Sequence, residues 1–160
     1  MIDKRALLEE LRSRLEEERA TTTRLALDAA AAVTHEDNKP ENDKDMRSTE
    51  ASYLARGQAE RVRELERSIA MLASLYVRTF TPDDKIAATA LVELLHGKTK
   101  LVCFVSPVAG GQRIRMDNVD VQVVTPTSPL GKALMGLSEG EDAEVSTPQG
   151  AKVYEIVSVR

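Results

Sequence analysis

Apolar residues recur at every third and fourth position along the first third of the chain, which is the spacing of one face of an α-helix. This pattern predicts a long helix over residues 3–33, which contain neither proline nor glycine. The pattern resumes at Ala51 and predicts a second helix that ends near Arg78, before Thr81-Pro82. The expected contact positions are Leu8, Leu11, Leu15, Glu18, Thr22, Leu25, Ala29, Ala32, Ala51, Ala55, Gln58, Val62, Leu65, Ile69, Leu72 and Tyr76. Two helices of matched length pair with each other, so we expect an antiparallel coiled coil.

Between the two helices lies a polar stretch, residues 35–50, which we call the acidic segment. Proline is favoured at the first position of a helix, so Pro40 allows the second helix to begin before Ala51, with Asp43 or Asp45 near its start. At 1.5 Å per residue the helices predict an arm of roughly 45 Å that carries the acidic segment at its end. The carboxylates of this segment are Glu36, Asp37, Glu41, Asp43, Asp45 and Glu50.

The C-terminal half shows a different pattern, in which short apolar runs alternate with turn residues such as Gly110-Gly111. We expect strands at residues 86–95, 100–105, 119–124, 143–146 and 152–159, and a short helix at residues 128–137. Strands separated by turns, together with one helix, predict a small antiparallel sheet domain and an α+β fold class. The expected domains are a coiled-coil arm at residues 1–80 and a sheet domain at residues 84–160.

Composition narrows the class of protein. The formal net charge of −4 argues against broad, non-specific binding of nucleic acid. No apolar run approaches the ~20 residues that span a bilayer, and the N-terminus does not resemble a signal peptide. We therefore expect a cytoplasmic protein with no membrane partner. Cys103 is the only cysteine and is expected to be a small buried side chain.

The C-terminal half resembles that of the bacterial Gre transcript-cleavage factors, the GreA/GreB family of transcription elongation factors. The matching features occur in the family's order and at about its spacing, and the two-helix arm extends the resemblance over nearly the whole chain. They are Val123-Val124-Thr125-Pro126, the run Ser-Pro-Leu-Gly-Lys-Ala-Leu-Met-Gly at 128–136, Gly140 with Asp142, the turn Thr147-Pro148-Gln149-Gly150, and Tyr154-Glu155-Ile156.

This resemblance implies an FKBP-like fold for the C-terminal domain, which in the family docks on the rim of the RNA polymerase secondary channel. It implies docking contacts at Thr127, Ser128 and Pro129, although Ser128 and Pro129 also suit a helix cap. The arm would enter the channel as a monomer, close to nascent RNA. Its carboxylates would help to hold a Mg²⁺ shared with the polymerase, with no cofactor bound tightly to the chain itself. At most, the chain would stimulate the polymerase's own hydrolysis of RNA.

The acidic segment departs from the family pattern Gly-Asp-Leu-Ser-Glu-Asn-Ala-Glu-Tyr. In an alignment without gaps, the family's aspartate falls on Met46 and its glutamate falls on Thr49. The candidate catalytic carboxylates are therefore Glu41, Asp43 and Asp45, of which Asp43 and Asp45 are the candidate metal ligands within the polymerase complex. Stimulation of RNA cleavage and regulation of the polymerase without cleavage both remain open.

Two further interpretations concern the arm and the fold. Arg56, Arg63 and Arg67 lie near one face of the second helix, where they either contact RNA or polymerase or form ion pairs with Glu60 and Glu64. A prolyl isomerase is excluded, because its pocket is lined by aromatic side chains, of which the C-terminal half offers only Phe104 and Tyr154, and because a fold does not carry an activity. The remaining alternative is a coiled-coil adaptor without chemistry.

Overall fold

The computed structural model describes the backbone of residues 1–36 and 41–160, and the side chains of residues 1–32 and 49–160. The chain forms two compact units. One is Arg12–Ala70, which we call the arm, and the other combines Met1–Leu11 with Met71–Arg160, which we call the sheet domain. The units therefore divide the chain differently from the predicted boundary near residue 80, because the beginning of the chain belongs to the sheet domain.

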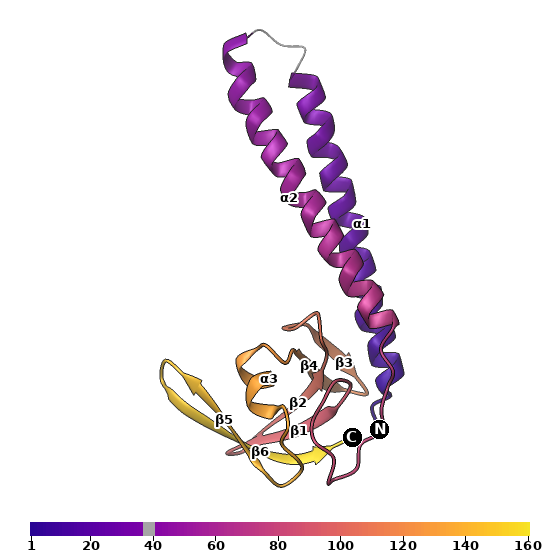
Figure 1. Ribbon diagram of the computed structural model, residues 1–160, viewed down its shortest axis with the longest axis vertical. Helices are drawn as coiled ribbons and strands as arrows, with labels where there is room; N and C mark the ends of the chain where they lie inside the picture. The colour runs from indigo at the N-terminus through magenta and orange to yellow at the C-terminus, as the bar shows by residue number, and fades with distance from the viewer. Residues whose placement is uncertain (37–40) are drawn as a thin grey trace. The chain divides into compact units, whose positions relative to one another are not determined.

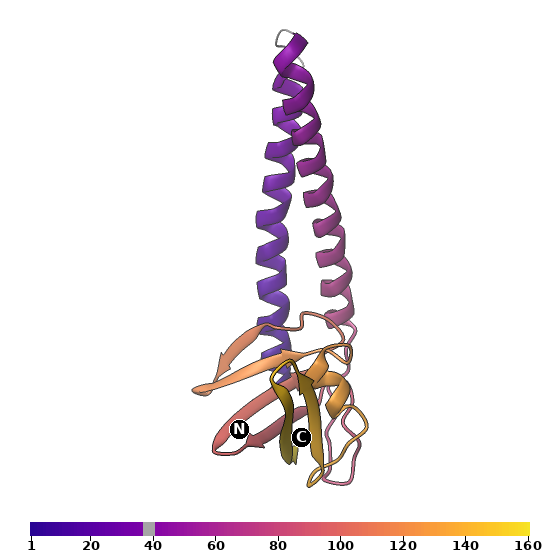
Figure 2. The ribbon, with the colours of Figure 1, turned by 90° about the vertical axis from the view of Figure 1, so that its left-hand side faces the viewer.

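Two helices supply the arm, as the apolar spacing predicted. Helix α1 is Lys4–Glu36 and helix α2 is Glu41–Ala73, and within the arm they run antiparallel and side by side (Figures 1 and 2). Buried side chains in the arm fall at predicted contact positions: Leu15, Thr22, Ala29 and Leu65. The predicted pairing of two long helices is confirmed.

Three predicted contact positions are wrong. Leu25 is 46% exposed and Ala32 is exposed, whereas Ala26, which was not predicted, is half-buried. The contact position after Thr22 is therefore four residues on, at Ala26, instead of three, and the predicted spacing resumes at Ala29, which is buried. Tyr76 is 81% exposed, because α2 ends before it.

Helix α2 begins ten residues before the apolar pattern resumes and ends five residues before the predicted position. At its end, the amides of Ser74 and Leu75 donate to carbonyls three residues earlier, both at 3.2 Å, which tightens the last turn. The backbone then leaves the helix, and the amide of Arg78 donates to the hydroxyl of Thr89 at 3.1 Å. This side-chain acceptor is not visible in any local pattern, which is why the end of the helix was misplaced.

The sheet domain contains a six-stranded sheet with the strand order β3-β4-β2-β1-β6-β5. A short helix, α3, is Pro129–Leu134 and packs beside β5 (Figure 1). The predicted α+β class is confirmed. The strands are β1 Leu91–His96, β2 Thr99–Val105, β3 Arg113–Met116, β4 Val119–Val124, β5 Asp142–Thr147 and β6 Gly150–Val159.

The sheet is mixed, whereas an antiparallel sheet was predicted. Strand β4 pairs with β2 in parallel, with Val102 beside Val121 and Val105 beside Val124, and the other four pairings are antiparallel. The cause is β3, a four-residue strand that the sequence analysis missed. The chain reverses direction before and after β3, so β4 returns beside β2 in the same direction.

Strand β1 begins at Leu91, five residues later than predicted. The preceding stretch forms turns instead, and Thr89 adopts a φ of 69°, a conformation that is strained for a β-branched residue. Thr89 is buried, its amide donates to the carbonyl of Val105 at 2.8 Å, and its hydroxyl accepts from Arg78. Those contacts hold the strained residue in place.

Both faces of the sheet are buried. One face carries Val92, Cys103 and Ile156, which pack in a core with Leu134 of α3. The other face carries Phe104 and five further buried side chains: Leu91, Val102, Ile114, Val121 and Val123. The same unit supplies buried Leu7, Leu8, Leu11 and Leu72. A sheet buried on both faces needs cover on each side, so the first turns of α1 belong to this domain.

Candidate functional site

The predicted docking residues lie at the start of α3 and form what we call the docking edge, residues 127–129. Ser128 is the N-cap of the helix, with φ −70° and ψ 155°, and its Oγ accepts from the amide of Gly131 at 3.1 Å. The same Oγ donates to the carbonyl of Thr125 at 2.8 Å. Thr127 and Pro129 are exposed on either side of this cap. The edge therefore presents a hydroxyl and a proline ring from a fixed backbone.

Close contact between α3 and the preceding loop fixes the docking edge further. A Cβ added to Gly131 would lie 1.8 Å from the carbonyl oxygen of Thr125, so only glycine fits there. The amide of Ser128 also donates to that carbonyl at 3.0 Å, and the hydroxyls of Thr125 and Thr127 lie 3.2 Å apart. Thr125 thus holds the backbone of the docking edge in place through its carbonyl, a role that the sequence analysis did not assign to it.

The predicted arginines of the arm are engaged by neighbouring groups. Arg63 and Arg67 both bond to Glu60, at 2.9 and 3.0 Å, which lowers the pKa of the Glu60 carboxyl, with the Arg63 hydrogen bond as the largest cause. The guanidinium of Arg56 lies 5.5 Å from the ring centroid of Tyr53. Arg63 and Arg67 therefore form ion pairs within the helix. Of the two predicted glutamate partners, only Glu60 accepts from them.

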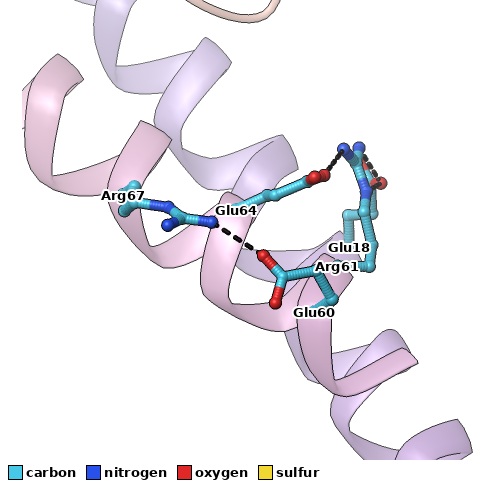
Figure 3. Close-up of polar contacts among 5 residues, drawn as sticks. All are labelled: Glu18, Glu60, Arg61, Glu64 and Arg67. Carbon is cyan, nitrogen blue, oxygen red and sulfur yellow. Dashed lines mark hydrogen bonds and ion pairs between the residues drawn. The ribbon is translucent and has the colours of Figure 1, made fainter. Parts of the chain in front are cut away.

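A contact that sequence reasoning missed joins the two helices of the arm. Arg61 of α2 donates to Glu18 of α1 at 2.6 Å and to Glu64 at 3.3 Å (Figure 3). The hydrogen bond to Glu18 is the largest cause that raises the pKa of Arg61 above its ordinary value. Glu18 was visible in the sequence as an interruption of the apolar seam, and that interruption is the signal that an oppositely charged residue lies across from it.

The candidate catalytic carboxylates lie at the first turns of α2. Glu41, Asp43 and Asp45 occupy the first, third and fifth positions of the helix, and their side chains lie outside the described residues. Asp37 lies outside them altogether. In the part of the chain whose side chains are described, no three His, Cys, Asp or Glu residues are grouped so that they could hold a metal ion.

Cys103 is fully buried in the sheet, as the sequence predicted, and burial raises the pKa of its thiol to about 12. A thiol of this kind stays protonated at physiological pH and is shielded from reagents. It is therefore a packing residue. His96 is exposed, and its Nδ1 lies 2.8 Å from the carbonyl of Val153.

Comparison with known proteins decides the family. The chain is 33% identical over 155 residues to the transcription elongation factor GreA of Bartonella tribocorum, an alignment that covers 97% of this chain and 91% of that protein. The chain belongs to the GreA/GreB family. The family's model for the C-terminal part of these transcription elongation factors matches residues 115–160, a range that contains the docking edge and α3.

Another member of the GreA/GreB family aligns over a shorter stretch. GreA of Methylococcus capsulatus is 33% identical over 104 residues, which cover 62% of this chain and 61% of that protein. Among solved structures, the GreA factor homolog Gfh1 of Thermus thermophilus aligns with 93% of this chain and 94% of its own, at 18% identity and a TM-score of 0.38. Among the described residues, no helix of this GreA/GreB member is both long and apolar enough to cross a membrane.

Proposed function

We propose that this chain binds RNA polymerase through the docking edge and places the acidic segment of the arm near the polymerase active centre. Its similarity to GreA along almost the whole chain supports the proposal. The observation that carries it is the fixed geometry of the docking edge, where Ser128 and Gly131 hold exposed Thr127 and Pro129 in one conformation. A surface that is rigid before binding loses little conformational entropy in the complex.

The acidic segment would act inside the polymerase complex. Carboxylates are hard oxygen ligands of the kind that Mg²⁺ prefers, and a Mg²⁺ bound there would stabilise charge and activate water for RNA hydrolysis. On α2, positions 41 and 45 are about one turn apart on the same side of the helix, whereas position 43 lies on the opposite side. This spacing changes the choice of ligands made from the sequence, so we propose Glu41 and Asp45, rather than Asp43 and Asp45, as the pair that acts together, with Asp43 in a lesser role.

The docking edge can be tested with Thr127→Arg. A long charged side chain at this exposed position should obstruct a close contact and weaken binding to RNA polymerase by about tenfold or more, as for a residue central to an interface. The matched control is Gln149→Arg, which adds the same side chain at an exposed position in the β5–β6 turn. Equal binding by the Thr127→Arg variant and the wild type would refute docking through this edge.

The acidic segment can be tested by replacing Glu41, Asp43 and Asp45 with Gln, Asn and Asn. The triple variant should still bind polymerase but lose its effect on stalled transcription complexes, measured both as RNA cleavage and as elongation rate. Glu41→Gln with Asp45→Asn should reproduce most of this loss, and Asp43→Asn alone should reproduce little of it. If the triple variant matches the wild type in both assays, the coiled-coil adaptor is the better description.

The two assays also separate the two forms of the proposed function. Loss of cleavage in the triple variant identifies a cleavage-stimulating factor. Faster elongation in the triple variant identifies a regulator that slows the polymerase without cleavage. The second form is favoured by Met46 and Thr49, which stand where the family pattern has its aspartate and glutamate, because Mg²⁺ tolerates little error in ligand geometry.

A further inference from the structure

Four large apolar side chains of the arm are exposed, and they are the only ones among its described residues. Leu25 and Leu27 of α1 are 46% and 66% exposed, and Tyr53 and Leu54 of α2 are 67% and 57% exposed. We call these four residues the apolar belt. Elsewhere on the described arm, the exposed positions carry mainly charged or small side chains such as those of the Glu60, Arg63 and Arg67 group.

The four residues lie at one level of the arm. The ion pair between Glu18 and Arg61 fixes which positions of the two antiparallel helices face each other (Figure 3). Because the helices are antiparallel, a step of seven residues forward along α1 and seven residues back along α2 leads from this ion pair to Leu25 and Leu54. Leu25 and Leu54 therefore lie at the same level of the arm. Leu27 and Tyr53 are their near neighbours in sequence. The belt therefore lies between the Glu18–Arg61 pair and the acidic segment.

The belt surrounds the arm. Successive residues of an α-helix are about 100° apart, so Leu25 and Leu27 point to nearly opposite sides of α1. Leu54 lines a shallow apolar groove of about 260 Å³ with Ala29, Ala32 and Ala51. Leu25 lies one helical turn before Ala29, on the side of α1 that faces this groove. Leu27 and Tyr53 lie away from the groove.

A second copy of the chain does not account for the belt. The four side chains expose roughly 400 Å² together at about 100 Å² each, but this area is divided between different sides of the arm. A flat or two-fold partner would cover only one side, and so only part of an apolar area that a standard interface would need in full. Exposed apolar groups on several sides at one level fit a partner that encloses the arm there.

We propose that the apolar belt contacts the wall of an enclosing, partly apolar passage in the partner protein. This inference rests on the proposed function, so the passage is the one through which the arm enters RNA polymerase. Contact on all sides at this level would centre the arm and fix its depth, and so would set where the acidic segment reaches.

Cross-linking tests whether the partner encloses the arm. Leu25 and Leu27 are replaced, one at a time, with the photoreactive residue p-benzoylphenylalanine, and each variant is irradiated in complex with RNA polymerase. An enclosing passage predicts that both variants form cross-links to polymerase subunits. Cross-linking from only one of the two positions would mean a one-sided partner surface and would overturn the proposal.

Binding tests whether the contact contributes affinity. A variant with Leu25, Leu27, Tyr53 and Leu54 all replaced by Gln should bind polymerase about tenfold more weakly, with a thermal midpoint close to that of the wild type because none of the four side chains is buried. The matched control replaces Met71, Tyr76, Val153 and Val157 by Gln, since these are exposed apolar residues outside the arm. The control should bind like the wild type.

The remaining outcomes are separable. If the wild type binds polymerase and the belt variant binds equally well, the belt proposal is overturned while the proposed function stands. If the wild type does not bind polymerase, both fail. If sedimentation shows a wild-type dimer that the belt variant converts to a monomer, the belt is a self-association surface and the proposal is overturned.

Discussion

Gly131→Ala is expected to destabilise the sheet domain by about 3 kcal/mol or more, at the upper end of the cost of overpacking. The added Cβ would lie 1.8 Å from the carbonyl oxygen of Thr125 and 2.9 Å from Oγ of Ser128. Backbone atoms cannot move aside as the end of a flexible side chain can, so α3 must shift away from the preceding loop. That shift breaks the N-cap and withdraws Leu134 from the core.

Cys103 offers a direct measurement of this loss. It is the only cysteine and is fully buried, so reaction with a thiol reagent reports opening of the sheet domain and nothing else. The Gly131→Ala variant should react at least tenfold faster than the wild type. Gly57→Ala is the matched control, because it adds the same methyl group where no atom lies within 4 Å. Unchanged thiol reactivity in Gly131→Ala would contradict the close contact described here.

Leu65→Asp is expected to destabilise the arm by about 3 kcal/mol, the effect of burying an unpaired charge. Leu65 is 1% exposed and lies close to the level of Leu15, at the centre of the seam between α1 and α2. The loss should be measured by urea denaturation followed through the helical circular dichroism signal.

The control for the arm is the same substitution in the same helix at an exposed position. Leu54→Asp, where the side chain is 57% exposed, should change the free energy of unfolding by about 0.5 kcal/mol or less. A comparable loss in both variants would mean that burial at Leu65 does not decide the stability of the arm, and it would contradict the paired seam.

The helices of the arm and most strands could be predicted from the sequence, because their apolar spacing is set by local geometry. The choice of Ala26 over Leu25 as the contact position after Thr22 could not, because steps of three and of four residues both keep a side chain near the same face of a helix, and only the partner helix decides between them. Strand β3 was missed because it is only four residues long, which is too short for its alternation of arginine with apolar side chains to stand out. Its absence from the prediction also concealed the parallel pairing of β2 with β4.

The candidate site could also be predicted only in part, and again only where local sequence patterns determine it. Ser128 and Pro129 were predicted both as docking residues and as a helix cap, and the structure confirms the cap. The supporting roles of Thr125 and Gly131 depend on two segments that approach each other in three dimensions, so no local pattern contains them. The carboxylates of the acidic segment were found by charge alone, and their assignment to a metal stays a prediction.

The division of the chain into two units has a consequence for folding kinetics. The arm, Arg12–Ala70, is an insertion within the sheet domain, whose two parts lie on either side of it in the sequence. Closing a flexible loop of this length has a considerable entropic cost, whereas a helical hairpin forms through local contacts and brings its ends together. We therefore expect the arm to fold first and to act as the loop closure for the sheet domain. Substitutions that loosen the arm should then slow the folding of a domain whose core they do not touch.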